Sequence, residues 1–200
     1  SCMTNYPAWF KDSEKLRPYN KRPDLGLHFN IKKPLIQTIS GSYLRILSKK
    51  NIERELHQQV DNFIKGLQQA PAYIDGHQHI HALPVIRDIV TRFSENHNIP
   101  IRITENSQQY FKAKVINTLG GKITARLIKQ KNLAYNHDLL GIYPFKQSEN
   151  YRQLFCQWLE KSKEGSLIMC HPGVLERSRK NELNYLLSQN FIDDLKKYQC

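Results

Sequence analysis

The sequence lacks long hydrophobic runs and paired cysteines. No apolar stretch approaches the roughly 20 residues that a membrane-spanning helix needs, so we expect no membrane partner. The four cysteines (Cys2, Cys156, Cys170 and Cys200) form no CxxC pair. This spacing argues against a structural zinc cluster and gives little reason to expect a disulfide framework. A reducing, cytoplasmic location is therefore the default expectation.

Internal repeats, low-complexity segments and linker-like stretches are also missing. The 200 residues are 40% hydrophobic and 24% charged, which is typical of a globular protein large enough to bury a core. We predict one domain over residues 1–200. No signal peptide is visible, and the chain starts with Ser1 rather than Met, so the natural N-terminus could lie further upstream.

Acidic residues are few relative to basic ones. Eighteen Asp and Glu against 30 Lys and Arg give a net charge of +12 and a pI of about 9.6. Such an excess is common in proteins that bind nucleic acid or another polyanion. The basic residues are nevertheless spread along the chain in short clusters, and no nucleic-acid-binding motif is present. A basic polyanion-binding module is therefore kept as an alternative, and sequence-specific nucleic-acid binding is not expected.

The most informative segment is YIDGHQHIHAL, residues 73–83, in which an acid and three imidazoles lie two residues apart. These four residues are Asp75, His77, His79 and His81. In an extended strand their side chains would all point to one side, whereas a helix would spread them. Gly76 and Pro84 interrupt a β-prone segment, so we predict a strand that ends in a loop. Imidazole and carboxylate together suit a divalent metal such as zinc, manganese, iron or cobalt, and the alternative is a solvated His-rich loop.

Helical and strand patterns alternate along the chain. Apolar residues recur three and four apart in several stretches, which predicts amphipathic helices at 51–67, 84–98, 151–161 and about 181–198. Short apolar runs predict strands at 25–31, 99–104 and 166–170, in addition to the segment with the histidines. The alternation predicts an α/β protein with a mainly parallel sheet or barrel. The stretch from Gln108 to His137, broken by Gly120-Gly121, is interpreted as an insertion that covers the mouth of the site.

Polar side chains lie at or just after the ends of these predicted strands. They come from four chain segments: His28, the Asp75 to His81 row, Arg102 and His171. Active sites of parallel α/β folds collect at the carboxyl ends of the strands. We therefore expect one shared site rather than four unrelated core or solvated histidines.

The same segments resemble the YdjC-like carbohydrate deacetylases, the family that includes chitooligosaccharide deacetylase. PDLGLHFNI at 23–31 resembles the family's GLHxNL motif, IDGHQHIHALP at 74–84 its D-(G/S)-H-x-H-x-H-x-x-P motif, and MCHPG at 169–173 its late HPG motif. The resemblance implies an irregular (β/α) barrel related to the NodB-type deacetylases. It also implies hydrolysis of N-acetyl groups from amino sugars or chitooligosaccharides, and hence an N-acetylated sugar as partner. A homodimer is one of the oligomeric states that the sequence allows.

The resemblance further implies roles for individual residues. His28 and His77 would be metal ligands, and His171 would be the catalytic acid or would stabilise the oxyanion. The residues that would bind substrate or orient the ligands are Asp75, His79, His81 and Arg102. The implied cofactor is a divalent ion, Mg²⁺ by resemblance, although the ligand types favour Zn²⁺, Mn²⁺ or Co²⁺.

One family feature is missing. The family begins with a strand that ends in an Asp-Asp pair, of which one carboxylate completes the metal site and the other is the general base. The chain's Asp193-Asp194 pair lies in the last predicted helix and cannot replace that pair by position. We therefore expect a chain that lacks the family's first βα unit. It would be either a fragment of a longer active protein or a truncated, inactive relative that only binds sugar or metal.

Overall fold

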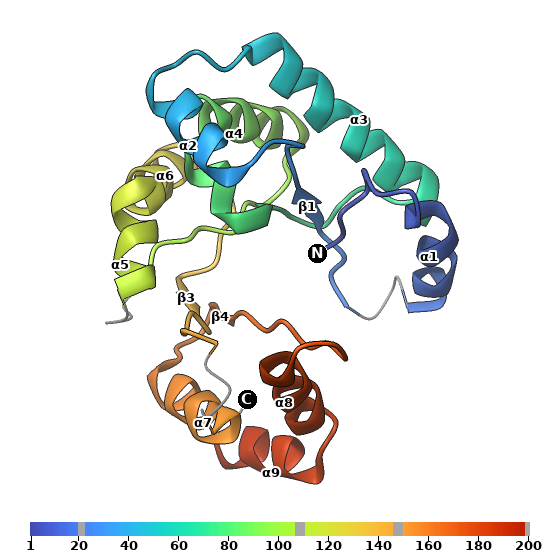
Figure 1. Cartoon of the computed structure of the whole chain (residues 1–200), viewed down its shortest axis with the longest axis vertical. Coiled ribbons are helices and arrows are strands. Elements are labelled where there is room, and N and C mark those ends of the chain that lie inside the picture. Colours follow the sequence, from blue (N-terminus) through green and yellow to red (C-terminus); the bar gives the residue numbers. More distant parts are fainter. Residues whose placement is uncertain (20–22, 107–110, 146–149, 199–200) are drawn as a thin grey trace. The chain divides into compact units, whose positions relative to one another are not determined.

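A computed structural model of the chain describes residues 1–19, 23–106, 111–145 and 150–198. It divides into two compact units, one formed by Ser1–Thr104 and Ile116–Tyr135, the other by Glu105–Val115 and Asn136–Cys200. Helices alternate with short parallel strands in both units (Figure 1). The α/β class predicted from the sequence is therefore confirmed. No helix of the described residues is long and apolar enough to cross a membrane.

The first unit is built around two short parallel strands. Its elements are α1 (Trp9–Leu16), the 3₁₀ turn η1 (Arg17–Tyr19), β1 (Leu27–Phe29), α2 (Leu35–Tyr43), α3 (Lys49–Leu67), β2 (Ile74–Gly76), the 3₁₀ segment η2 (His77–Ala82), α4 (Ile86–His97), the π-helical turn η3 (Asn117–Gly121) and α6 (Lys122–Gln130). In the β1–β2 pair, Leu27 is opposite Ile74 and His28 is opposite Asp75. Parallel bridges join Cys2 to Leu27 and Ile74 to Ile101. Four chain segments thus lie side by side in sequence order.

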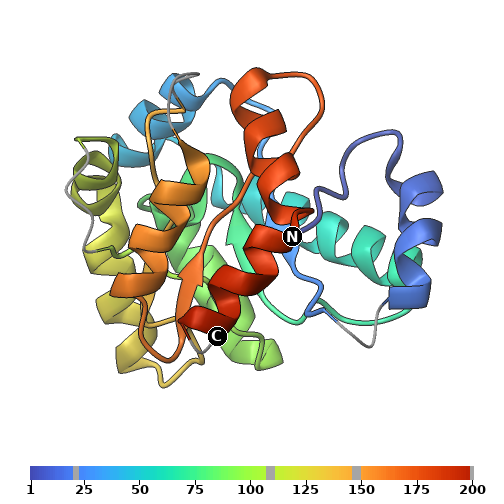
Figure 2. The same cartoon turned by 90° about the horizontal axis from the view of Figure 1, so that it is seen from below.

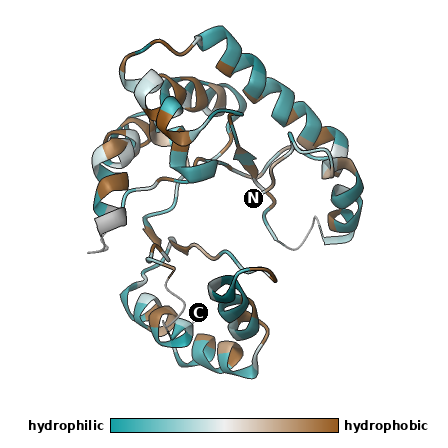
Figure 3. Cartoon of the chain, in the orientation of Figure 1, coloured by the Kyte–Doolittle hydropathy of each residue, from teal (hydrophilic) through white to brown (hydrophobic). Residues whose placement is uncertain are grey.

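Helix α3 shows why the predicted helices formed. The Ser48 side chain accepts a hydrogen bond from the Asn51 N–H at its start, and Gln68 ends it in a left-handed conformation. Its buried residues recur three and four apart, and the rest of the helix is mostly hydrophilic (Figure 3). Helix α1 packs against it (Figure 2). Trp9 Nε1 donates a hydrogen bond to the Asn62 carbonyl at 2.8 Å. Burial of this apolar face in the core of the unit fixes the helix.

One predicted strand is largely absent. Residues 99–104 were expected to alternate as a strand, but pairing there is limited to the Ile101 bridge. Ile99, Ile101 and Ile103 are nevertheless all buried, as the alternation requires. The side-chain pattern was therefore read correctly, whereas the extent of hydrogen bonding, which depends on the neighbouring segment, was not.

The second unit also pairs two strands in parallel. It contains α5 (Phe111–Ile116, whose last residue belongs to the first unit), β3 (Asp138–Leu140), α7 (Tyr151–Lys161), β4 (Ser166–Ile168), α8 (Arg177–Leu186) and α9 (Gln189–Lys197). The single helix predicted over 181–198 is wrong, because Leu187 and Ser188 separate α8 from α9. The Ser188 side chain accepts a hydrogen bond from the Phe191 N–H and so begins the second helix. The core between these helices is largely aromatic.

The stretch interpreted as a covering insertion includes residues 107–110, which lie outside the described residues. The part in the first unit forms η3 and α6 and packs on η2. Gly120 has a φ of 133°, and a Cβ there would lie 2.1 Å from the Ala82 carbonyl oxygen, so only glycine fits. Thr124 Oγ1 donates to the same carbonyl at 3.1 Å. These contacts fix η3 and α6 beside the segment that carries the histidines.

Candidate functional site

A buried carboxylate, Asp75, is the centre of a polar cluster in the first unit. Its side chain is 1% exposed. Ser1 Oγ donates to it at 3.0 Å, Arg102 Nη1 forms an ion pair with it at 3.0 Å, and His28 Nδ1 is in hydrogen-bond contact with its other oxygen. The strand register explains the last contact, because residues opposite each other in a parallel pair point to the same face. Three chain segments and the first residue therefore meet at one carboxylate.

The neighbours of Asp75 stabilise its ionised form. Burial alone would raise the pKa of Asp75, but the hydrogen bond from His28 and the positive charge of Arg102 outweigh it and hold the pKa well below its usual range. Asp75 is therefore ionised at neutral pH. An ionised carboxylate only accepts hydrogen bonds, so Nδ1 of His28 carries the proton of this contact and Nε2 is the ring nitrogen left to face another partner. This is the arrangement of histidines that bind metals through Nε2.

The row of histidines does not continue as a strand. Strand β2 ends at Gly76, and η2 follows with Gln78 and His79 in the left-handed region, at φ values of 50° and 61°. The arrangement with all four side chains on one face, which an extended strand would give, is therefore wrong beyond Gly76. His81 turns back against Gly76, where a Cβ would lie 2.7 Å from its Nδ1. Glycine at this position lets the chain fold back.

The three histidines consequently have different surroundings. The ring of His77 lies beside that of His28, with centroids 5.5 Å apart at an interplanar angle of 76°. His81 is 1% exposed, and its Nε2 donates to the Arg102 carbonyl at 2.8 Å. His79 is half-buried on the turn between them. The structure thus brings His28, Asp75, His77, His81 and Arg102 together, as expected for three of the four strand-end segments.

Burial keeps two of these imidazoles neutral. It lowers the pKa of His81 to about 4, helped by the charge of Arg102. It also lowers the pKa of His77, where the neighbouring His28 acts in the same direction. A neutral imidazole retains a lone pair on one ring nitrogen. His77 is therefore available as a ligand near neutral pH. Nε2 of His81, in contrast, already donates a hydrogen bond to the Arg102 carbonyl.

The donor chemistry fits part of a divalent metal site. His28 is oriented by a carboxylate, His77 lies beside it, and both are imidazoles of the kind that zinc, manganese and cobalt accept. Within the described residues, no group of three or more His, Cys, Asp or Glu side chains is arranged to hold a metal. Asp75 is engaged by His28 and Arg102, so it orients rather than ligates. Two imidazoles are fewer than a complete coordination shell, so a metal bound here would need further ligands.

His171 belongs to the second unit and lies three residues after β4. Its backbone N–H donates to Glu182 Oε2 at 2.5 Å, and its ring contacts the ring of Phe145 at a centroid distance of 5.6 Å. Glu182 is fully buried on α8 and was not identified from the sequence. Nothing in the local pattern could have indicated it, because its partners are distant in sequence.

Asp194, the second residue of the Asp193-Asp194 pair, joins helices of the second unit. Arg152 donates to both carboxylate oxygens of Asp194 at 2.8 and 2.9 Å, and Tyr185 Oη donates at 2.9 Å. The hydrogen bonds from Arg152 and then Tyr185 lower the pKa of this carboxyl. Asp194 thus joins α7, α8 and α9 in the second unit. The expectation that this pair does not replace the family's Asp-Asp pair agrees with these contacts.

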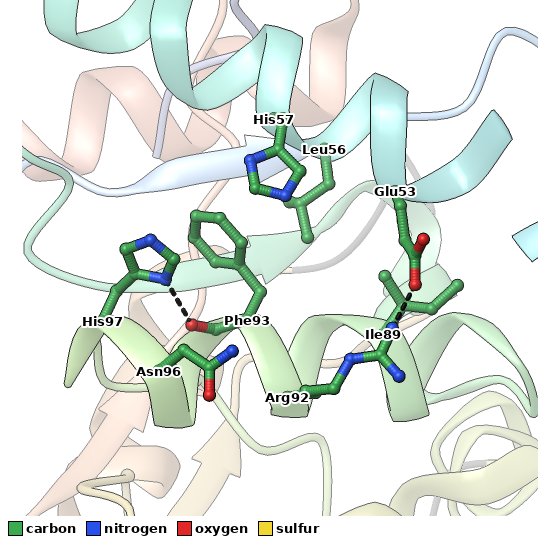
Figure 4. A pocket seen from close by; sticks show the side chains of 8 residues that line it. All are labelled: Glu53, Leu56, His57, Ile89, Arg92, Phe93, Asn96 and His97. Carbon is green, nitrogen blue, oxygen red and sulfur yellow. Dashed lines mark hydrogen bonds and ion pairs between the residues drawn. The ribbon is translucent and has the colours of Figure 1, made fainter. Parts of the chain in front are cut away.

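A small pocket of about 90 Å³ lies between α3 and α4 of the first unit (Figure 4). Leu56, Ile89 and Phe93 contribute apolar surface, and the ring of Phe93 contacts both His57 and His97. Arg92 forms an ion pair with Glu53 at its edge. The pocket is lined by helices and not by strand ends, so it is separate from the Asp75 cluster. Its exposed His57 offers a matched control for substitutions in that cluster.

Comparison with known proteins gives relatives of one kind. A chitooligosaccharide deacetylase of Yersinia enterocolitica is 25% identical over 135 residues, which cover 66% of this chain and 47% of that protein. One of Yersinia pestis (strain Pestoides F) is 26% identical over 136 residues, with the same coverage. The chain thus spans about half the length of the curated relatives it matches.

A solved structure and a family model agree with these relatives. The structure, from Enterococcus faecalis V583, is described as a candidate cellobiose-phosphate cleavage protein. It is 16% identical, has a TM-score of 0.68 and covers 98% of this chain and 82% of its own. The family model described as YdjC-like protein matches residues 1–197. The chain therefore belongs to the YdjC-like family.

Proposed function

We propose that this chain carries the catalytic core of a metal-dependent hydrolase that removes N-acetyl groups from amino sugars or chitooligosaccharides. The observation that carries the proposal is the His28–Asp75–Arg102 cluster with His77 beside it, at adjacent parallel strands of a chain that belongs to the YdjC-like family. The names of the curated relatives supply the substrate class. We also infer that both units belong to a single irregular (β/α) barrel domain related to the NodB-type deacetylases.

Amide hydrolysis needs polarisation of the carbonyl, activation of water and a proton for the leaving amine. A bound divalent ion, held in part by His28 and His77, would supply the Lewis acid. Zinc, manganese and cobalt suit these ligands, and Mg²⁺ is the ion implied by the resemblance.

The chain's own residues prepare the site for that ion. Asp75 accepts the Nδ1–H of His28 and so turns Nε2 away from that carboxylate. Arg102 keeps Asp75 ionised, and the hydrogen bond from His81 to the Arg102 carbonyl fixes the segment that carries Arg102. His171 is proposed to donate the proton to the leaving amine. His79, half-buried on the turn after His77, is proposed to line the substrate side.

The test measures acetate release from N-acetylated chitooligosaccharides by the full chain encoded by the gene, with Mg²⁺, Zn²⁺, Mn²⁺ or Co²⁺ added separately. Release that requires a metal, and that falls at least about tenfold in His77→Ala, is expected for a ligand. His57→Ala, which changes an exposed histidine outside the cluster, should retain the wild-type rate.

Other outcomes lead to the alternatives. Calorimetric metal binding that is lost in His77→Ala, without acetate release under any condition, would indicate a relative that only binds metal or sugar. Steeply salt-dependent binding to random RNA, with metal binding unaffected by His77→Ala, would instead support a basic polyanion-binding module. Equal acetate release by the wild type and His77→Ala would refute the assignment of His77.

A further inference from the structure

Glu182 is a carboxylate with no exposure to solvent, on helix α8 of the second unit. Its Oε1 accepts a hydrogen bond from Tyr143 Oη at 2.5 Å, and its Oε2 accepts one from the backbone N–H of His171 at 2.5 Å. Each oxygen is thus used by a different segment. Burying a carboxylate is costly unless its oxygens are hydrogen-bonded, so the two donors stabilise its position.

Glu182 is also connected to the His171 ring, through contacts with two aromatic residues. Tyr143, held by Glu182, packs on Phe145 with ring centroids 4.2 Å apart. Phe145 in turn contacts the imidazole of His171 edge to face, at 5.6 Å between centroids. Glu182 therefore acts on His171 from two sides, at its backbone directly and at its ring through Tyr143 and Phe145.

A second hydrogen bond fixes the same loop to the same helix. The Gly173 N–H donates to the Arg179 carbonyl at 3.1 Å, so the His171-Pro172-Gly173 segment is attached to α8 at both ends. A helix packed in an aromatic core is a rigid support for such a loop. Glu176, an exposed residue just before α8, forms an ion pair with Arg179 at 3.0 Å.

We infer that Glu182 is a positioning residue, which with Tyr143 holds His171 in the orientation that it needs to transfer a proton. The inference rests on the proposed function, because it takes His171 as the group that protonates the leaving amine. Glu182 contacts the backbone N–H of His171 and the hydroxyl of Tyr143, so it acts on the imidazole through Tyr143, Phe145 and the loop. Reactions that need a positioned proton donor are sensitive to displacements of this donor of about 1 Å.

The central variant is Glu182→Gln, which keeps the side-chain size but presents an NH₂ group to one of the two donors. We expect kcat to fall roughly ten- to a hundredfold, with KM changed less than about twofold, because substrate binding elsewhere is retained. Tyr143→Phe removes one donor and leaves the contact to the His171 N–H, so a smaller loss of kcat with the same pattern is expected. Glu176→Gln, a matched change beside the same helix, should behave as the wild type.

NMR gives a measurement that does not depend on activity and so tests the positioning role of Glu182 separately from the proposed deacetylase function. NMR of the full chain should show a changed His171 imidazole titration and faster exchange of the His171 amide in Glu182→Gln, but neither change in Glu176→Gln. Absence of acetate release by the wild type would refute the proposed function while these spectra still decide the positioning. Spectra of Glu182→Gln and Tyr143→Phe that both match the wild type at His171 would overturn the inference. If Glu182→Gln does not fold, Tyr143→Phe alone decides it by the same spectra.

Discussion

Replacing Asp75 with Asn tests the electrostatic centre of the site. The side chain keeps its size, but the charge between His28 and Arg102 disappears. Both partners of the ion pair are buried, with exposed fractions of 1% for Asp75 and 8% for Arg102. Removing one partner of a buried pair leaves the other charge uncompensated and costs about 3–5 kcal/mol. We expect a loss of this size in the free energy of unfolding.

Urea unfolding, followed by circular dichroism at pH 7, measures this loss. The control is Asp12→Asn, which removes an exposed pair with Lys15 at 3.1 Å, where the side chains are 56% and 72% exposed. Such a pair contributes at most about 0.5 kcal/mol. Equal losses for Asp75→Asn and Asp12→Asn would refute the reasoning that burial makes the Asp75 pair energetically important.

A double-mutant cycle separates the pair from other effects at Asp75. Arg102→Met removes the guanidinium and keeps an unbranched side chain of similar reach. If the two residues interact as the 3.0 Å contact indicates, the loss for the double variant should be smaller than the sum of the single losses by at least about 1 kcal/mol. Strict additivity would show that the destabilisation comes from His28 or Ser1 instead.

Three further outcomes follow from the site. The pKa of His81 is about 4 in the folded protein, against an ordinary value of 6.5. As the pH falls, the unfolded chain therefore takes up the proton before the folded protein does. The contribution of His81 to the free energy of unfolding is full above about pH 6.5 and falls by on the order of 3 kcal/mol as the pH drops to 4. His81→Phe should flatten that part of a stability–pH profile, and an unchanged slope would contradict the assignment. Gly76→Ala should lower the free energy of unfolding by about 1–3 kcal/mol, measured by thermal melts, because its Cβ would lie 2.9 Å from the His81 backbone nitrogen. Gly173→Ala is the control and should change it little, because the nearest atoms to its Cβ would lie at 3.4 Å. His28→Ala should weaken Zn²⁺ binding in calorimetry at least about tenfold, and unchanged affinity would remove it from the ligands.

Much of the fold could be predicted because its elements depend on local pattern. The periodic apolar residues of α3 and α4 predicted both helices, and the run before the HPG motif predicted β4. The break at Ser188 was missed, because one capping side chain ended a pattern that otherwise continues. Only a three-dimensional arrangement could show the turn after Gly76, since its left-handed residues, Gln78 and His79, are not glycines.

The candidate site shows the same limit. Residue types and strand-end positions were enough to bring His28, Asp75 and Arg102 together, because parallel strands place their carboxyl ends at one edge. Glu182 was not predictable, since its partners lie 11 and 39 residues away and its own helix is rich in polar residues. Contacts of that kind depend on packing in the second unit and leave no periodic signal.

The turn after Gly76 gives the three histidines separate tasks that one continuous strand could not. Three imidazoles on one face would compete for the same ion and would leave the neighbouring segment unattached. Instead, His81 turns inward and donates a hydrogen bond to the Arg102 carbonyl. The Arg102 side chain forms an ion pair with Asp75, and Asp75 accepts a hydrogen bond from His28. His77 remains beside His28 with a lowered pKa. The orientation of one proposed ligand thus depends on a different, fully buried histidine that is bonded to the backbone of the neighbouring segment.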